Sequence, residues 1–221
     1  GHTRGEAIEG MRNALDAFEV EGIGHNLPFL AAVMDHPRFI SGDISTAFIA
    51  EEYPDGFFGA AIDDAALERL AAAAIRLKMI RERRDAHITG ALSNHEREVG
   101  AEMVVTLARQ TFAGRARNGD LLLRRLDSPA VPKDFDYDAG RVVPVSTEWT
   151  PGDTLARMTV DGVPMTIKVD PLTEGFRLRY RGADLTAIVR TPHIARLAAL
   201  MPEKLPPDTS KMLLCPMPGL V

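Results

Sequence analysis

The side chains best suited to metal binding or proton transfer in this 221-residue chain are its six histidines, at positions 2, 25, 36, 87, 95 and 193. No two of them are three or four residues apart, the spacing that places two metal ligands on one face of a helix. His25 and His36 stand where predicted helices begin or end. A histidine in such a position usually bonds backbone groups, so we expect that role for both rather than catalysis.

Charged clusters and nucleophile motifs give no stronger signal. The acidic pair at 63–64 and the alternating run Asp134–Asp138 bring carboxylates together, but the run lacks the glycine and distal glutamate of a calcium loop, so we expect it to be solvated. The basic run Arg81–Asp85 could clamp an anion, yet its interleaved acids are typical of a solvated helix face. The sequence contains neither a glycine-rich phosphate loop nor a serine nucleophile elbow.

Composition and charge exclude several classes of protein. Hydrophobic residues make up 45% of the chain, and 26 Lys and Arg stand against 31 Asp and Glu, which excludes a disordered chain, a fibre and a basic nucleic-acid binder. The longest apolar runs, such as 71–75, are far shorter than the ~20 residues that span a membrane. The single cysteine, Cys215, cannot form an internal disulfide, so we expect a soluble cytoplasmic protein. Since the chain starts at Gly1 and stops at Val221 within an apolar stretch, we also expect it to be part of a longer polypeptide.

The first sixty residues predict three helices. Apolar residues recur at helical spacing over 4–18, behind a Thr-x-x-Glu pattern at 3–6 that favours a helix start. Further helices are predicted over 26–34 and 44–52. Glycines and prolines at 52–59 then interrupt the pattern and indicate a domain boundary.

One long helix follows. From residue 63 to about residue 88 there is no Gly or Pro, and strong helix formers dominate. The first half of this helix is apolar on nearly all sides and must therefore be enclosed, whereas its second half is charged.

After Gly90 the apolar period changes from 3.6 to 2, which indicates strands. Eight are predicted, at 102–108, 111–117, 121–126, 141–147, 155–160, 165–169, 176–181 and 185–190. Because a closed barrel removes exposed strand edges, we predict an α+β fold, with a short helical segment and then a long helix associated with an eight-stranded antiparallel β-barrel. A last helix at 193–200 and a proline-rich tether follow.

Both ends of the chain resemble known domains. Residues Met11–Leu15, Gly22–Asn26, His36–Phe39 and Glu52–Pro54 resemble the C-terminal end of the biotin carboxylase domain of acyl-CoA carboxylases. Residues Ser210–Val221, which contain a Pro-Met-Pro-Gly turn, look like the start of a biotin carboxyl carrier domain. The long helix, the barrel and a Leu-Met-Pro-Glu-Lys linker lie between them, an order that resembles the alpha subunits of propionyl-CoA carboxylases.

This resemblance divides the chain into four parts: the end of a biotin carboxylase domain at 1–59, a BT domain at 60–200, a linker at 201–211 and the start of a carrier domain at 212–221. Within the BT domain it implies a long helix at 63–88, a hook at 87–100, a barrel at 101–191 and a helix at 193–200. The BT domain of the family is a barrel around a long helix that holds the alpha subunit to the beta subunit.

The resemblance also implies an activity. In the family, the alpha subunit uses ATP and bicarbonate to carboxylate biotin, and a carboxyltransferase beta subunit passes the carboxyl group to propionyl-CoA to give methylmalonyl-CoA, so the holoenzyme is a ligase. The residues that bind ATP and magnesium are expected before Gly1, and the biotinylated lysine after Val221. We therefore expect no catalytic, cofactor-binding or metal-binding residue in this segment. Lys78 and Lys211 precede a methionine as a biotinylated lysine does, but neither is predicted to lie at a hairpin tip.

The expected role of the segment is to dock the biotin carboxylase and carrier domains onto the beta subunit, with other alpha subunits held only through a large alpha–beta assembly. The stretch 87–100 is too apolar for a plain linker, and the corresponding connection of the family is a hook that reaches into the beta subunit. We predict five partner-binding residues: Ile88, Leu92 and Val99 as apolar anchors, and His95 and Arg97 as polar contacts at the rim.

Two alternatives share this pattern. Alpha subunits of the methylcrotonyl-CoA and geranyl-CoA carboxylases have the same architecture, because the family selects the acyl group in the beta subunit. A free-standing barrel that binds a small apolar ligand is the other alternative. Such a barrel needs an empty interior, whereas a barrel filled by the long helix can only be a scaffold.

Overall fold

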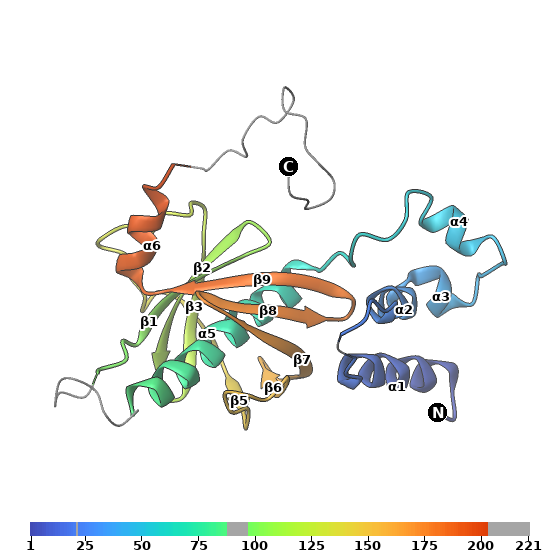
Figure 1. The fold of residues 1–221 in the computed structure, drawn as a ribbon, viewed down its shortest axis with the longest axis horizontal. Coiled ribbons are helices and arrows are strands. Elements are labelled where there is room, and N and C mark those ends of the chain that lie inside the picture. The colour runs from blue at the N-terminus through green and yellow to red at the C-terminus, as the bar shows by residue number, and fades with distance from the viewer. Residues whose placement is uncertain (21, 88–96, 203–221) are drawn as a thin grey trace, which may run out of the picture.

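The computed structural model describes residues 1–20, 22–87 and 97–202. It consists of an arm, which we define as residues 1–59, and a β-barrel wound around one long helix (Figure 1). The arm lies beside one end of the barrel, and a last helix lies on the outside of the barrel, away from the arm. No helix in the described part of the chain is long and apolar enough to cross a membrane.

The arm contains four helices: α1 (Arg4–Ala17), α2 (Leu27–Asp35), α3 (Pro37–Ser41) and α4 (Phe48–Glu52). As predicted, the Thr3 hydroxyl caps α1 by accepting from the Glu6 backbone N–H at 3.2 Å. The Glu6 carboxylate accepts from the backbone N–H of His2 at 2.7 Å, so the reciprocal bond is displaced by one residue.

The helix predicted over 44–52 is wrong in extent, because the observed helix starts later in the chain. Gly42 adopts a left-handed conformation with φ +87° and ends α3, which the sequence did not predict. The Ser45 hydroxyl then accepts from the Ala47 N–H at 3.2 Å, which holds a turn where the helix was expected. As a result α4 starts only at Phe48.

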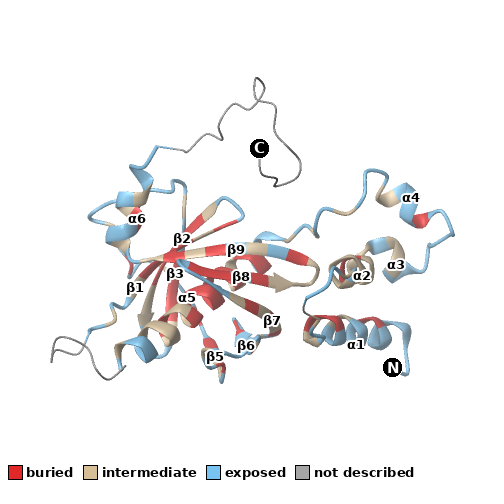
Figure 2. Cartoon of the chain, in the orientation of Figure 1, coloured by how far each residue is buried: buried red, intermediate tan, exposed pale blue. Residues whose placement is uncertain are grey.

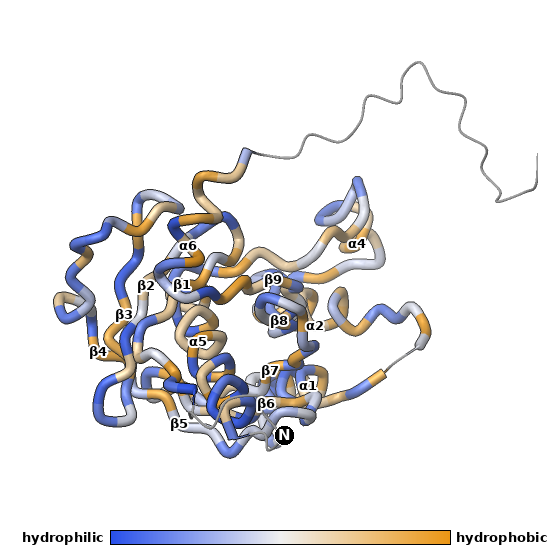
Figure 3. The backbone as a smooth tube through the Cα atoms, turned by 60° about the vertical axis from the view of Figure 1, so that its left-hand side comes forward, coloured by the Kyte–Doolittle hydropathy of each residue, from blue (hydrophilic) through white to orange (hydrophobic). Residues whose placement is uncertain are grey.

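The long helix α5 (Asp64–Ala86) agrees with the predicted helix over 63–88. The Asp63 carboxylate caps it by accepting from the Ala66 N–H at 2.6 Å. Along its first half every residue from Leu70 to Ile75 is buried (Figure 2). The hydropathy of the helix then falls toward its C-terminal turns, which are charged (Figure 3).

The barrel is a single antiparallel sheet in the order β4-β3-β2-β1-β9-β8-β7-β6-β5. Its nine strands are β1 (Glu102–Leu107), β2 (Gln110–Arg117), β3 (Asp120–Leu126), β4 (Arg141–Val143), β5 (Val145–Thr147), β6 (Leu155–Val160), β7 (Val163–Leu172), β8 (Gly175–Tyr180) and β9 (Ala183–Arg190). The prediction of eight strands was one short, because the predicted strand at 141–147 is two strands.

Pro144 divides that segment, since proline has no N–H to donate to a ladder. β4 pairs with β3, whereas β5 pairs with β6 at the other end of the sheet. The two ends of the sheet are therefore consecutive in the chain and meet at Pro144, whose carbonyl accepts from the Asp161 N–H at 2.9 Å. The nearly closed barrel confirms the predicted α+β fold.

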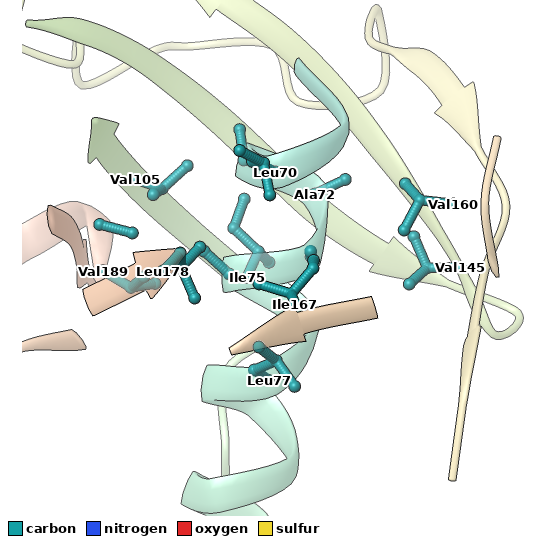
Figure 4. Packing of buried hydrophobic residues seen from close by; sticks show 14 of the residues in the cluster. Leu70, Ala72, Ile75, Leu77, Val105, Val145, Val160, Ile167, Leu178 and Val189 are labelled. Carbon is teal, nitrogen blue, oxygen red and sulfur yellow. The ribbon is translucent and has the colours of Figure 1, made fainter. Parts of the chain in front are cut away.

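The core of the barrel is α5 itself. Leu70, Ile75 and Leu77 project among the inner residues of the strands, such as Ile167 and Leu178 (Figure 4). These side chains occupy the space that a ligand barrel would keep empty, so the alternative of a free-standing ligand-binding barrel is wrong.

One close approach between α5 and β2 makes this packing testable. A β-carbon at Gly114 would lie 2.7 Å from Cδ1 of Ile75. We expect Gly114→Ala to cost about 1–3 kcal/mol of unfolding free energy through overpacking, and Ile75→Val about 0.5–1.5 kcal/mol. Because valine lacks the δ carbon, the double variant should lose about 0.5–3 kcal/mol less than the sum of the two. Chemical denaturation of the four proteins measures this coupling, and additive losses would contradict the contact.

A second, smaller core lies outside the sheet, under the loop that joins β3 to β4 and under α6 (Pro192–Ala199). The predicted solvated run Asp134–Asp138 belongs to this loop. Its last carboxylate pairs with Arg115 at 2.9 Å, and Asp136 accepts from the Asp138 N–H at 2.9 Å. In residues 1–20, 22–87 and 97–202 no group of three or more His, Cys, Asp or Glu side chains is arranged to hold a metal.

Candidate docking surfaces

The tip of the β8–β9 hairpin is one of the parts of the barrel that contact the arm (Figure 1). Arg181 and Gly182 form its two-residue turn, with φ +50° and +80°, as the favoured hairpin turn requires. A β-carbon at Gly182 would lie 2.5 Å from the carbonyl oxygen of Pro28 in α2. The Gly182 carbonyl also accepts from the Ala60 N–H at 3.1 Å. The turn is therefore fitted against the arm with no room for a larger residue.

Arg181 binds three side chains of α1. Its backbone N–H donates to Oδ1 of Asp16 at 3.0 Å, and its Nε lies 3.2 Å from Oδ2 of the same carboxylate. Its Nη2 donates to Glu9 at 2.8 Å and to Asn13 at 3.1 Å. We call these three residues, together with Arg181 and Gly182, the arm–barrel seam.

Asp16 is the unusual member of the seam. Its side chain is only 6% exposed, and it occupies the last turn of α1, where the helix dipole disfavours a negative charge. Burial raises the pKa of Asp16, and the N–H and charge of Arg181 oppose that rise. A carboxylate kept in such a place needs its partner, so the pair ties α1 to the barrel.

A second cation of the barrel acts at the same end of α1. Nζ of Lys168, on β7, donates to the carbonyl of Leu15 at 3.2 Å, where the helix leaves carbonyl groups unpaired. Burial lowers the pKa of Lys168, and the nearby Arg179 lowers it further. Both Lys168 and Arg181 thus place positive charge at the negative end of α1.

The pH dependence of the seam can be predicted from Glu9. The hydrogen bond from Arg181 lowers the pKa of Glu9, so its ionised form stabilises the fold above the unfolded pKa of about 4.3. That contribution is lost as the pH falls through the lowered pKa. We expect Glu9→Gln to destabilise α1 slightly at neutral pH, and we expect its difference from wild type to shrink as the pH falls below the unfolded pKa.

Thermal unfolding of wild type and Glu9→Gln over a series of pH values from neutral to acid measures this difference. Asp16 has the opposite sign, because its raised pKa stabilises the fold as the pH falls, and the charge of Glu9 contributes a small part of that rise. A difference between the two proteins that does not change with pH would contradict the ionic role of Glu9.

Of the predicted hook residues, Ile88, Leu92 and His95 lie outside the described residues. Arg97 forms an ion pair with Glu82 of α5, and Val99 is half-buried and packs against the barrel core. The structure therefore ties Arg97 to the long helix and Val99 to the barrel.

The two histidines expected at helix ends, His25 and His36, differ in their hydrogen bonds. Nδ1 of His36 accepts from the Arg38 N–H at 3.3 Å, as predicted, and its Nε2 lies 3.2 Å from Glu52. Nδ1 of His25 is buried and has no hydrogen-bond partner among the described residues, so the predicted backbone bond is missing at that atom.

Comparison with known proteins matches both parts of the chain. The family model of the propionyl-coenzyme A carboxylase BT domain matches residues 70–204, and that of the biotin carboxylase C-terminal domain matches residues 1–51. The chain is 54% identical to the propionyl-CoA carboxylase alpha chain of Ruegeria pomeroyi, over 99% of this chain and 31% of that protein. It is 30% identical to the mitochondrial propionyl-CoA carboxylase alpha chain of Rattus norvegicus, over 100% of this chain and 29% of that protein.

A shorter match covers about a fifth of the chain. The biotin carboxylase of Halalkalibacterium halodurans is 49% identical over 47 residues, which is 21% of this chain and 10% of that protein. The chain spans about three tenths of the length of the alpha chains that it matches.

Proposed function

Because the chain belongs to the propionyl-CoA carboxylase BT-domain family, we propose that it is the scaffold of a biotin-dependent carboxylase alpha subunit, which docks the biotin carboxylase and carrier domains onto a carboxyltransferase beta subunit. The holoenzyme would be a ligase that forms methylmalonyl-CoA from propionyl-CoA, bicarbonate and ATP. The names of the relatives support propionyl-CoA over the methylcrotonyl and geranyl alternatives.

The observation that carries this proposal is the seam. It joins the segment that matches a biotin carboxylase domain to the barrel that matches a BT domain, through a buried ion pair between Asp16 and Arg181. A scaffold between catalytic domains needs a rigid joint. Because α5 fills the core of the barrel, the barrel is closely packed and can serve as the rigid side of that joint.

The cofactors are proposed to bind elsewhere in the full-length subunit, with ATP and magnesium on the biotin carboxylase domain and biotin on a lysine of the carrier domain. Lys78 fits no biotin attachment site, because it lies within α5, is 12% exposed and pairs with Glu82 at 2.8 Å. Lys211 lies outside the described residues. The single cysteine supports a cytoplasmic location.

The proposed contact with the beta subunit is the hook, with Ile88, Leu92 and Val99 as anchors and His95 and Arg97 at the rim. The bond between Arg97 and Glu82 supports a hook whose base is fixed to α5. Since Val99 packs on the barrel core, its share of the contact would be the part of its side chain that stays exposed.

Exchanging Leu92 for Asp should abolish co-purification of the alpha subunit with the beta subunit, because a charge would replace a buried anchor. The thermal unfolding of the alpha subunit should stay nearly unchanged. Leu197→Asp is the matched control, since Leu197 is 49% exposed on α6 and outside the hook. Assembly that survives Leu92→Asp, or that fails equally with the control, would refute the hook.

A further inference from the structure

The connection between the arm and α5 has little structure of its own. Residues 53–63 form neither helix nor strand, and Gly56 and Gly59 lie in this stretch with φ of +93° and +108°. Irregular backbone of this kind does not by itself set the angle between arm and barrel, and the described bond from its Ala60 N–H runs to Gly182 of the hairpin turn.

The seam supplies what the connection lacks. Arg181 is tied to Asp16 by its backbone as well as by its guanidinium, and to Glu9 through the same side chain. Contacts at three positions along α1 fix the rotation of that helix about its axis as well as its distance from the barrel. Gly182 lies so close to α2 that a β-carbon there would meet the Pro28 carbonyl at 2.5 Å, so one hairpin turn packs against both long helices of the arm.

We infer that Asp16 and Arg181 are positioning residues, which set the orientation of the biotin carboxylase domain on the barrel and so the path between the site where biotin is carboxylated and the site where it delivers the carboxyl group. This inference rests on the proposed function. Neither residue takes part in a chemical step. Their effect falls on reactions that need both sites, and a partial reaction that uses only the biotin carboxylase domain does not depend on them.

The test uses the full-length alpha subunit assembled with the beta subunit and compares two rates: the carboxylation of free biotin and the carboxylation of propionyl-CoA. Arg181→Leu should leave the first rate unchanged and lower the second on the order of 10-fold, because the effective concentration of a tethered group at the second site depends on the span that its tether has to cover. Arg181→Lys keeps the charge without the planar fork and should restore part of the second rate.

Arg177→Leu is the matched control. Arg177 lies on the same hairpin, and its Nε donates to Asp184 at 2.7 Å, but this pair stays within the hairpin. Both rates should survive its loss. Equal losses from Arg177→Leu and Arg181→Leu, a fall in free-biotin carboxylation, or an unchanged propionyl-CoA rate would each overturn the inference. A wild-type assembly that does not carboxylate propionyl-CoA would instead refute the proposed function.

Discussion

Replacing Leu70 or Leu77 with alanine should lower the unfolding free energy of the protein by about 2–5 kcal/mol each. Leu70 is 1% exposed and Leu77 is fully buried, and both project from α5 into the interior of the barrel. The loss combines the transfer of the missing methyl groups with the cavity left behind, which strands on every side keep from collapsing.

Chemical denaturation of the two variants measures this loss. Leu197→Ala serves as the control, because it makes the same change on α6 at a position that is 49% exposed, where we expect an effect within about 0.5 kcal/mol. Similar results for all three variants would mean that α5 is not enclosed.

The second large effect is expected at the seam. Asp16→Ala leaves the half-buried Arg181 without its most buried carboxylate partner, and breaking such a pair from one side costs about 3–5 kcal/mol. Arg181 keeps its bonds to Glu9 and Asn13, so we expect a value of about 3 kcal/mol. Because the seam joins arm and barrel, this loss should lower the free energy that is needed to open the arm away from the barrel.

Native-state hydrogen exchange separates the two parts. The amides of α1 should exchange faster by the factor that corresponds to the loss of about 3 kcal/mol. The amides of β7 and β9 should stay as protected as in wild type. Asp16→Ala combined with Arg181→Met should recover part of the loss, because it removes the unpaired cation as well. Equal deprotection of arm and barrel would show that the pair stabilises the whole fold rather than the joint.

Long elements with a regular period could be predicted from the sequence. α5 differs from its predicted bounds by at most two residues at each end, because a long stretch of strong helix formers without Gly or Pro pairs its backbone groups locally. The strands were found wherever apolar residues alternate. The missed break at Pro144 was visible as a residue, but its meaning depends on β4 and β5 pairing with different neighbours, and this pairing is not local.

The seam could not be predicted from local sequence patterns. Asp16 and Arg181 are 165 positions apart in the chain, and each alone resembles an ordinary residue of a helix or a turn. One local signal could have drawn attention to Asp16: an acidic residue in the last turn of a predicted helix opposes the dipole and suggests a cation from elsewhere. Nothing in the sequence says which of the 26 basic residues supplies it.

The break at Pro144 limits how the sheet of one chain can pair with the sheet of another. The two edge strands of the sheet, β4 and β5, are only three residues long each. A neighbouring chain that adds a strand, as in edge-to-edge aggregation, needs a longer row of free backbone groups than either edge offers. Pairing of one barrel with another through these edges is therefore disfavoured.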